Sequence, residues 1–441
     1  MNRDTKRRLL KACRIDEPVP PGDHRHYEFD SPELHLRGQP WRERASQVID
    51  LASEGESTTQ ILTGLPGSGK STELRQLEED LRGRGYRVLF ADAGAWIRDD
   101  APITTQDILL ALVLALYPKG MPENMTGWVR EYAQQVRNFL NSQAKVGDIS
   151  FSAGAVDVGL ELQTNDTLFQ QVARHLSDLQ GLRELVFGLL KVAAEGARNA
   201  GTPLVILLDG IEKRATGDLA GPEKREEFRN HWFGAFLTNA RDLRPPLHVV
   251  YTVPPFMVRR AAELGNQFGH ELLFLPMIRV LEGQPEEERP RIHTPGVCAM
   301  REALFRRVDE VYFEDRTVPA WLAFHSGGYM RDLLRLVIEC IYRCPDGGVI
   351  TKELAEAAVI QVRQTYLEGF EVSDESLLQQ VHQEKDFPLD SQNQQRMDAL
   401  LQSYVLLRYH NSRFWYDAHP LLWSRLGIPL PTWEEIAALC P

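Results

Sequence analysis

Residues 64–72 read Gly64-Leu65-Pro66-Gly67-Ser68-Gly69-Lys70-Ser71-Thr72. The stretch matches the pattern G-x-x-x-x-G-K-[ST] of a phosphate-binding loop, the Walker A motif. Its glycines let successive backbone N–H groups point at one anion, and its lysine reaches the β- and γ-phosphates. Apolar residues predict a strand at 60–63 before the loop and a helix at 71–81 after it. An accidental glycine-rich turn would lack this context, so the stretch predicts a nucleotide site.

The loop supplies most of the residues expected to bind the cofactors, which are ATP and Mg²⁺. The hydroxyl of Ser71 is expected to ligate Mg²⁺, and the positive end of the following helix favours the phosphates. The residues expected to contact the nucleotide are Gly64, Pro66, Gly67, Ser68, Gly69, Lys70, Ser71 and Thr72.

A second acidic motif follows the apolar run at 204–208. A continuous apolar run predicts a strand buried on both faces of a parallel sheet. The strand ends at Asp209, whose carboxylate is expected to hold Mg²⁺, as in a Walker B motif. Glu212 is placed to orient or deprotonate the attacking water. The alternative is that Asp209 only caps the next helix.

Further strands are expected at 86–92, 247–253 and 271–275, with helices between them, one of which is expected over 228–240. This alternation predicts an α/β fold, a three-layer sandwich with a parallel sheet. Thr252, near the end of its strand, is a candidate contact to the γ-phosphate or the attacking water, or it is only solvated there. A short helix at 256–264 carries Arg259 and Arg260.

The C-terminal part, beyond an acidic and proline-rich loop, is expected to be helical. Gly327-Gly328 precedes a helix whose first turn carries Arg331. Helix starts favour acidic residues, so an arginine there suggests that Arg331 faces an anion. The alternative is a surface arginine paired with Asp332 or Glu339.

The last 70 residues predict a helix at 392–401 and strands at 404–410 and 414–417, joined by a tight turn. Helix, helix and hairpin follow one another as in a winged helix-turn-helix. The hairpin carries Arg408, His410 and Arg413. Its function is either DNA contact or interaction with protein.

The chain divides into four expected segments. They are an N-terminal arm (1–40), an α/β core (41–282), a helical lid (283–370) and a winged-helix-like domain (371–441). In the arm, Pro18, Pro20 and Pro21 are expected to break any helix. Residues 27–30 and 34–39 are expected to form a short extended arm, which either closes over the adenine ring or forms a plain strand. An insertion at about 118–165 contains a helix at 125–142 and a hairpin at 148–162. That hairpin either contacts a partner or packs on the core.

Composition limits the class of protein. With 43% hydrophobic and 25% charged residues the chain is typical of a soluble globular protein, and no apolar run is long enough to cross a membrane. A net charge of −12 argues against strong non-specific nucleic-acid binding but leaves a local basic patch open. None of the five cysteines forms a C-x-x-C pair. A reduced, cytoplasmic protein is expected.

These motifs together resemble the AAA+ and STAND branch of P-loop ATPases, near the initiator-type clade. The resemblance rests on the Walker A and B stretches, the Thr252-Val253-Pro254-Pro255 strand end and the run from Gly327 to Arg335. It implies that Arg331 contacts the γ-phosphate as sensor 2 and that Thr252 is sensor 1. It also implies that Arg259 or Arg260 reaches the ATP of a neighbouring subunit, so a homo-oligomer is expected.

One departure from the family pattern concerns hydrolysis. In most AAA+ proteins a glutamate directly follows the Walker B aspartate, whereas here Gly210 follows and the acid returns at Glu212, as in the STAND branch. This implies slow or assembly-dependent hydrolysis. The expected function is an ATP-dependent switch that oligomerises and regulates a separate effector protein, as in bacterial antiviral defence. The alternatives are an initiator-like or DNA-loading ATPase that uses the C-terminal domain, and a nucleotide-binding scaffold without turnover.

Overall fold

The computed structural model describes residues 1–31, 34–38, 40–53, 55–97, 102–117, 138, 162, 169, 172–173, 179–212, 222–284, 291–367, 370–388 and 393–440. The chain forms two compact units. The first unit consists of Met1–Trp41, Gly64–Thr72 and Leu275–Pro441, and the second of Arg42–Thr63 and Glu73–Phe274. No helix within the described ranges is long and apolar enough to span a bilayer.

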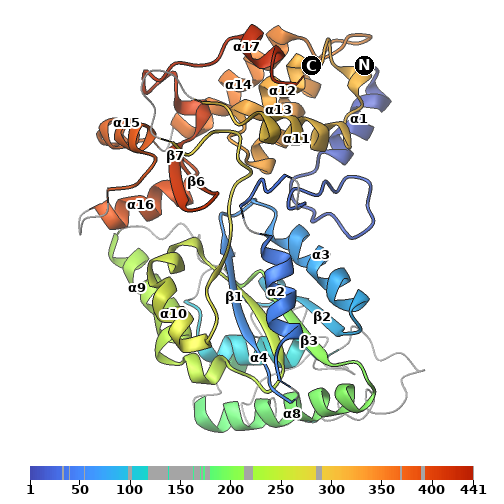
Figure 1. Ribbon diagram of the computed structural model, residues 1–441, viewed down its shortest axis with the longest axis vertical. Helices are drawn as coiled ribbons and strands as arrows, with labels where there is room; N and C mark the ends of the chain where they lie inside the picture. The colour runs from blue at the N-terminus through green and yellow to red at the C-terminus, as the bar shows by residue number, and fades with distance from the viewer. Residues whose placement is uncertain are drawn as a thin grey trace. The chain divides into compact units, whose positions relative to one another are not determined.

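The second unit is built on a five-stranded sheet with the order β2-β3-β4-β1-β5 (Figure 1). β4 pairs in parallel with β1 and β3, and β3 pairs in parallel with β2. β1, β3 and β4 are buried along their whole length, and the sequence of β3 is accordingly apolar up to Asp209. The predicted α/β fold with a parallel sheet is confirmed. The strands are β1 (Thr59–Gly64), β2 (Arg87–Asp92), β3 (Leu204–Asp209), β4 (His248–Val253) and β5 (Leu273–Leu275).

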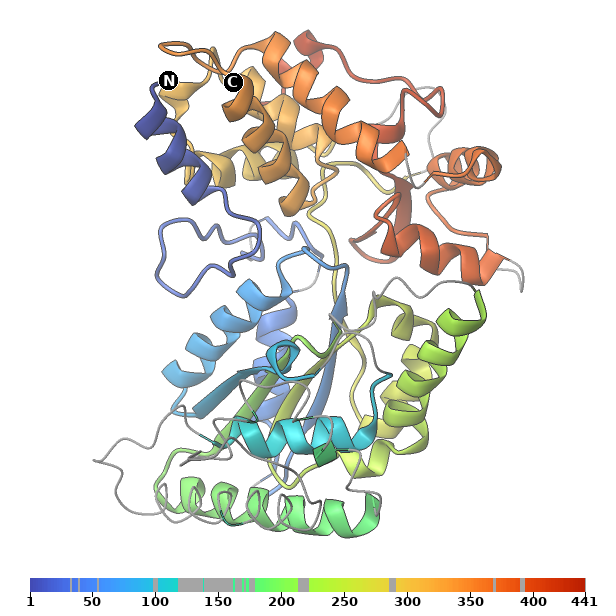
Figure 2. The same cartoon turned by 180° about the vertical axis from the view of Figure 1, so that it is seen from behind.

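The most buried helix of this unit is α4. It lies between the sheet and α8, as both views show (Figures 1 and 2). Residues 108–114 are fully buried, and a capping box formed by Thr104 and Asp107 begins the helix. The helices of the unit are α2 (Trp41–Asp50), α3 (Lys70–Gly83), α4 (Thr105–Ala115), α8 (Leu179–Asn199), α9 (Pro222–Phe233) and α10 (Ala261–Phe268).

Two segments of this unit that the sequence predicts as single α-helices are not continuous α-helices in the structure. The helix expected over 228–240 ends at Phe233 and continues as a π-helix (Gly234–Thr238) and a 3-10 turn (Ala240–Leu243). Gly234, a poor helix former, stands where the α-helix ends. The helix expected at 256–264 is a 3-10 turn (Pro255–Arg260) followed by α10. The expected helix at 125–142 and hairpin at 148–162 lie, except for 138 and 162, outside the described residues.

The first unit is a helical assembly around α12, which is buried over most of its length. α11, α13, α14 and α17 pack against α12. Its helices are α1 (Arg3–Ala12), α11 (Thr294–Phe305), α12 (Thr317–His325), α13 (Met330–Arg343), α14 (Lys352–Leu367), α15 (Glu375–Glu384), α16 (Asn393–Gln402) and α17 (Trp433–Ala437).

The expectation that the N-terminal arm contains no helix is wrong for its first part, which forms α1. The prolines of the arm begin only at Pro18, so nothing interrupts a helix before that point. The side chain of Asn2 caps α1. α1 packs against α13 and buries Leu9.

A β-hairpin of β6 (Leu406–His410) and β7 (Phe414–Ala418) follows α16. It packs onto the helical part of the first unit. The Tyr409 hydroxyl donates to the Gly327 carbonyl at 2.7 Å, and Met277 N donates to the Arg408 carbonyl at 3.0 Å. A Cβ at Gly327 would lie 2.4 Å from Leu407. The predicted order of helix, helix and hairpin is observed, while its assignment as a winged helix remains a prediction.

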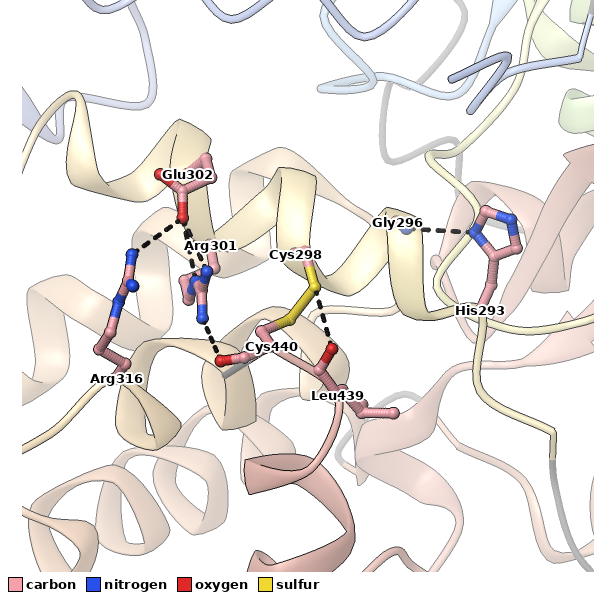
Figure 3. The surroundings of a disulfide bond; sticks show 8 residues. All are labelled: His293, Gly296, Cys298, Arg301, Glu302, Arg316, Leu439 and Cys440. Carbon is pink, nitrogen blue, oxygen red and sulfur yellow. Dashed lines mark hydrogen bonds and ion pairs between the residues drawn. A yellow bond between two sulfur atoms is a disulfide. The ribbon is translucent and has the colours of Figure 1, made fainter. Parts of the chain in front are cut away.

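The cysteines depart from the expectation of a fully reduced chain. Cys298 on α11 and Cys440 form a disulfide, 142 residues apart (Figure 3). Arg301 Nη1 donates to the Cys440 carbonyl at 2.6 Å, so the C-terminal segment is attached to α11 by two kinds of bond. Cys13, Cys340 and Cys344 are buried thiols. No spacing rule could have paired two cysteines so far apart.

Candidate functional site

The Walker A residues form a glycine-lined turn between β1 and α3, as predicted. Gly67 and Gly69 have φ values of +81° and +100°, which residues with a Cβ rarely adopt. Lys70 is the first residue of α3 and is 4% exposed. Its Nζ donates to the carbonyls of Gly64 at 2.9 Å and Leu65 at 3.3 Å. A strand, a glycine turn and a helix thus follow one another, which is the context expected for a phosphate-binding loop.

The N-terminal segment contacts this loop within the first unit. Val19 N donates to Thr72 Oγ1 at 3.1 Å, and Arg37 Nη2 donates to the Ser68 carbonyl at 3.4 Å. Arg37 is 3% exposed and pairs with Asp30 at 3.3 Å. Sequence reasoning missed Arg37, because a single arginine in a polar arm carries no pattern.

Two residues at the start of α13 lie against the Walker A loop. The Tyr329 hydroxyl donates to the Pro66 carbonyl at 2.7 Å. A Cβ built on Gly67 would lie 2.5 Å from Tyr329 Oη and 2.6 Å from Arg331 Nε. Arg331 is therefore beside the predicted phosphate-binding loop, as the interpretation of an anion-facing arginine requires. Nothing in the sequence pointed to Tyr329 as a contact of the loop.

The polar atoms at this place fit a bound anion. Ser68 Oγ and Arg331 Nε are buried and have no hydrogen-bond partner among the described residues. A buried donor without an acceptor costs free energy, so such atoms usually have a partner in the functional state. Two hydrogen-bond donors beside a glycine-rich turn could both donate to the oxygens of a phosphate.

A buried carboxylate fixes the start of α13. Asp332 is fully buried, accepts a hydrogen bond from the Tyr366 hydroxyl and pairs with Arg335 at 3.1 Å. His419 Nδ1 accepts from Leu421 N, so the ring proton is on Nε2, which lies 3.1 Å from Asp332. Burial raises the pKa of Asp332, but His419, Tyr366 and Arg335 outweigh it and bring that pKa below its ordinary value. The alternative in which Asp332 pairs with Arg331 is not observed.

The second unit holds the acidic residues. Thr252, fully buried on β4, donates its hydroxyl to Glu212 Oε2 at 2.5 Å. Glu212 itself is 5% exposed. The sequence suggested a role for each residue separately, and the structure shows that they form a pair. A candidate base held by a second polar group is the usual arrangement for general-base chemistry.

The end of β3 explains why glycine follows Asp209. Asp209 is 1% exposed and is the register partner of Asp92 at the end of β2. Gly210 has a φ of +82°, and a Cβ there would lie 2.1 Å from Asp92 Oδ1. A glutamate at position 210 would be strained at this φ and would displace the Asp92 side chain, which accounts for the glycine there. Asp92 was not singled out from the sequence, although it too ends a strand.

Arg259 and Arg260 lie on the 3-10 turn before α10, and both are half-buried. Arg260 pairs with Glu263 at 2.5 Å and lies over the ring of Phe233 at 5.3 Å. Arg260 is thus occupied within its own unit.

A scan against protein-family models gives no match, and neither does a search of curated protein sequences. Among solved structures, the chain is similar to the Aeropyrum pernix ORC2 protein in its ADPNP–ADP complexes. That similarity has 13% identity and a TM-score of 0.42, and covers 98% of this chain and 97% of the other. A Drosophila ORC structure bound to DNA gives 9% identity and a TM-score of 0.39, covering 100% of this chain and 93% of the other.

Proposed function

We propose that this chain is an ATP-binding and ATP-hydrolysing switch of the AAA+/STAND type. The observation that carries the proposal is the contact of Tyr329 and Arg331 with the Walker A loop at Gly67. Both residues begin α13, so a change in the charge held by the loop acts directly on that helix. Loss of a γ-phosphate would remove a partner of Arg331 and release the helix.

Hydrolysis is assigned to the buried pair in the second unit. Glu212 orients or deprotonates the attacking water, and Thr252 holds its carboxylate. Lys70 and Arg331 share the negative charge of the phosphates. Ser71 and Asp209 are the proposed Mg²⁺ ligands, and the ion would neutralise charge on the phosphates.

The output we propose is ATP-dependent assembly into a homo-oligomer that regulates a separate effector protein. A trans arginine typically contributes about 10³–10⁵ in rate. Arg259 and Arg260, both on the 3-10 turn before α10, are the candidates for this role. Turnover should therefore rise with protein concentration.

The test is the mass of the full chain without nucleotide, with ADP and with ATP, measured by light scattering after size exclusion. ATP is expected to produce a discrete assembly that is lost in Lys70→Ala and prolonged in Glu212→Gln. A mass that never depends on nucleotide would refute assembly as the output. Failure of Lys70→Ala to lower ATP affinity would refute the nucleotide site itself.

The alternative, DNA contact through the hairpin, is less well supported by the placement of its basic residues. Arg408 is 6% exposed, and its guanidinium lies 4.0 Å from the centre of the Phe414 ring. Only a hairpin that opens could present Arg408 to a phosphate, whereas Arg413 is exposed. Salt-dependent DNA affinity that is lost in both Arg408→Ala and Arg413→Ala would favour the alternative.

A further inference from the structure

A cavity of about 1330 Å³ lies in the second unit at the amino ends of β1 and β4. It is bordered by the end of α2, by α8, by the 3-10 turn Ala240–Leu243 and by the end of α10. The Walker A segment follows the carboxyl end of β1, and Thr252 and Asp209 lie at the carboxyl ends of their strands. The cavity is therefore at the other edge of the sheet from every residue assigned to ATP.

The side chains that line the cavity carry a net positive charge, whereas the whole chain has a net negative charge. Five of the lining side chains are Arg or Lys and two are Glu, although the whole chain has a net charge of −12. Arg183 pairs with Asp242 at 3.0 Å. Arg241 and Arg244 make no ion pair or side-chain hydrogen bond with any of the residues that the structure describes. Arg44 and Lys191 also have carboxylate partners, so Arg241 and Arg244 are the lining cations that are available to a bound anion.

The two arginines belong to one short 3-10 turn and its end. The turn covers Ala240–Leu243, and Arg244 follows it as the C-cap residue. Leu243 between them is fully buried, and Asp242 is bound by Arg183. His270 also lines the cavity, and burial and the charge of Arg244 lower its pKa, so it stays neutral beside the arginines.

Apolar side chains also line the cavity, among polar ones such as Gln47, Ser57 and Thr58. Val48, Leu51, Phe187 and Phe268 line the cavity, and Leu51 is 83% exposed. A largely exposed leucine at the edge of a cavity suits a ligand that also has an apolar part.

We propose that this cavity binds a phosphate ester of a small molecule with an aromatic or apolar body, of about the size of a mononucleotide. Arg241 and Arg244 bind the phosphate, since guanidinium groups pair with phosphate oxygens through two parallel hydrogen bonds. Lys191 and Arg183 add charge at the rim, and Phe187 contacts the body. This is a second anion site, independent of the ATP proposal.

The test uses calorimetry on the full chain carrying Lys70→Ala, which suppresses binding at the Walker A loop. AMP is the probe, and adenosine and inorganic phosphate, which are its two parts, are measured separately. AMP is expected to bind more tightly than either part. Adding Arg241→Glu and Arg244→Glu should weaken AMP about tenfold or more. Arg241→Gln and Arg244→Gln should do the same without adding negative charge.

The matched control is Arg198→Glu, an exposed arginine at the end of α8 that does not line the cavity. It should leave AMP affinity unchanged. An equal loss in the control would mean diffuse attraction and would overturn the proposal, as would the absence of heat with millimolar AMP. Binding of polyglutamate without binding of AMP would also overturn it, in favour of a surface for acidic protein.

Discussion

Replacing Thr252 by Val should reduce ATP hydrolysis while leaving ATP binding intact. The change preserves shape and burial but removes the hydroxyl that donates to Glu212 at 2.5 Å. A hydrogen bond to a charged group contributes roughly 1.5–3 kcal/mol. If that energy holds Glu212 in its reactive orientation, its loss slows hydrolysis about 10- to 150-fold, since each 1.36 kcal/mol is about tenfold in rate.

The assay is single-turnover hydrolysis at saturating ATP, with ATP affinity measured by calorimetry on the same samples. Thr252→Ser keeps the hydroxyl and should retain most of the rate. Thr63→Val is the matched control, because Thr63 is also fully buried in the sheet but donates to the Val253 carbonyl at 2.8 Å. Normal hydrolysis in Thr252→Val, or an equal loss in Thr63→Val, would refute a positioning role for Thr252.

Three further outcomes are expected. Tyr329→Phe removes the hydroxyl that donates to the Pro66 carbonyl. The change should weaken ATP binding by about 1 kcal/mol, or roughly fivefold, as measured by calorimetry. Unchanged affinity would show that this hydrogen bond does not contribute to ATP binding. Burial lowers the pKa of His325 to about 4, so the unfolded state binds more protons between pH 6.5 and 4. The free energy of unfolding should therefore fall by about 3 kcal/mol as pH drops through that window. In His325→Gln, the free energy of unfolding measured in urea should depend less on pH. An unchanged pH dependence in that variant would contradict the assignment. Replacing Cys298 and Cys440 by Ser opens a loop of 142 residues. The change should lower the free energy of unfolding, measured in urea, by about 2–5 kcal/mol. Equal stability with and without the disulfide would contradict a stabilising role for this bond.

Much of the sheet could be predicted because its strands are short apolar runs between glycines and prolines. β1, β3 and β4 begin and end within about one residue of the expected bounds, since central strands of a parallel sheet need apolar residues on both faces. α1 could not be predicted in the same way. Its sequence is mostly charged, and only its packing against α13 decides that it is a helix.

The candidate site shows the same limit. Spacing alone places Asp209 and Glu212, because each follows a recognisable strand. It does not reveal that Thr252 is the partner of Glu212, since 40 residues separate them and neither has a pattern that refers to the other. The preference for glycine at position 210 arises from its positive φ and from the nearby Asp92 side chain, and so it is a property of the folded sheet.

The first unit is assembled from three separate segments of the chain, and this has a consequence for folding during synthesis. The ribosome adds residues at about 5–20 per second, and domains generally fold as they emerge. All of the second unit lies before Leu275, so it can fold while the rest is being made. The hydrogen bond between Tyr329 and Pro66 joins residues 263 apart, which corresponds to a delay of about 13–50 seconds. During that interval the newly made Walker A loop lacks its later partners, so a nascent chain that meets ATP in the cell would do so before α13 exists.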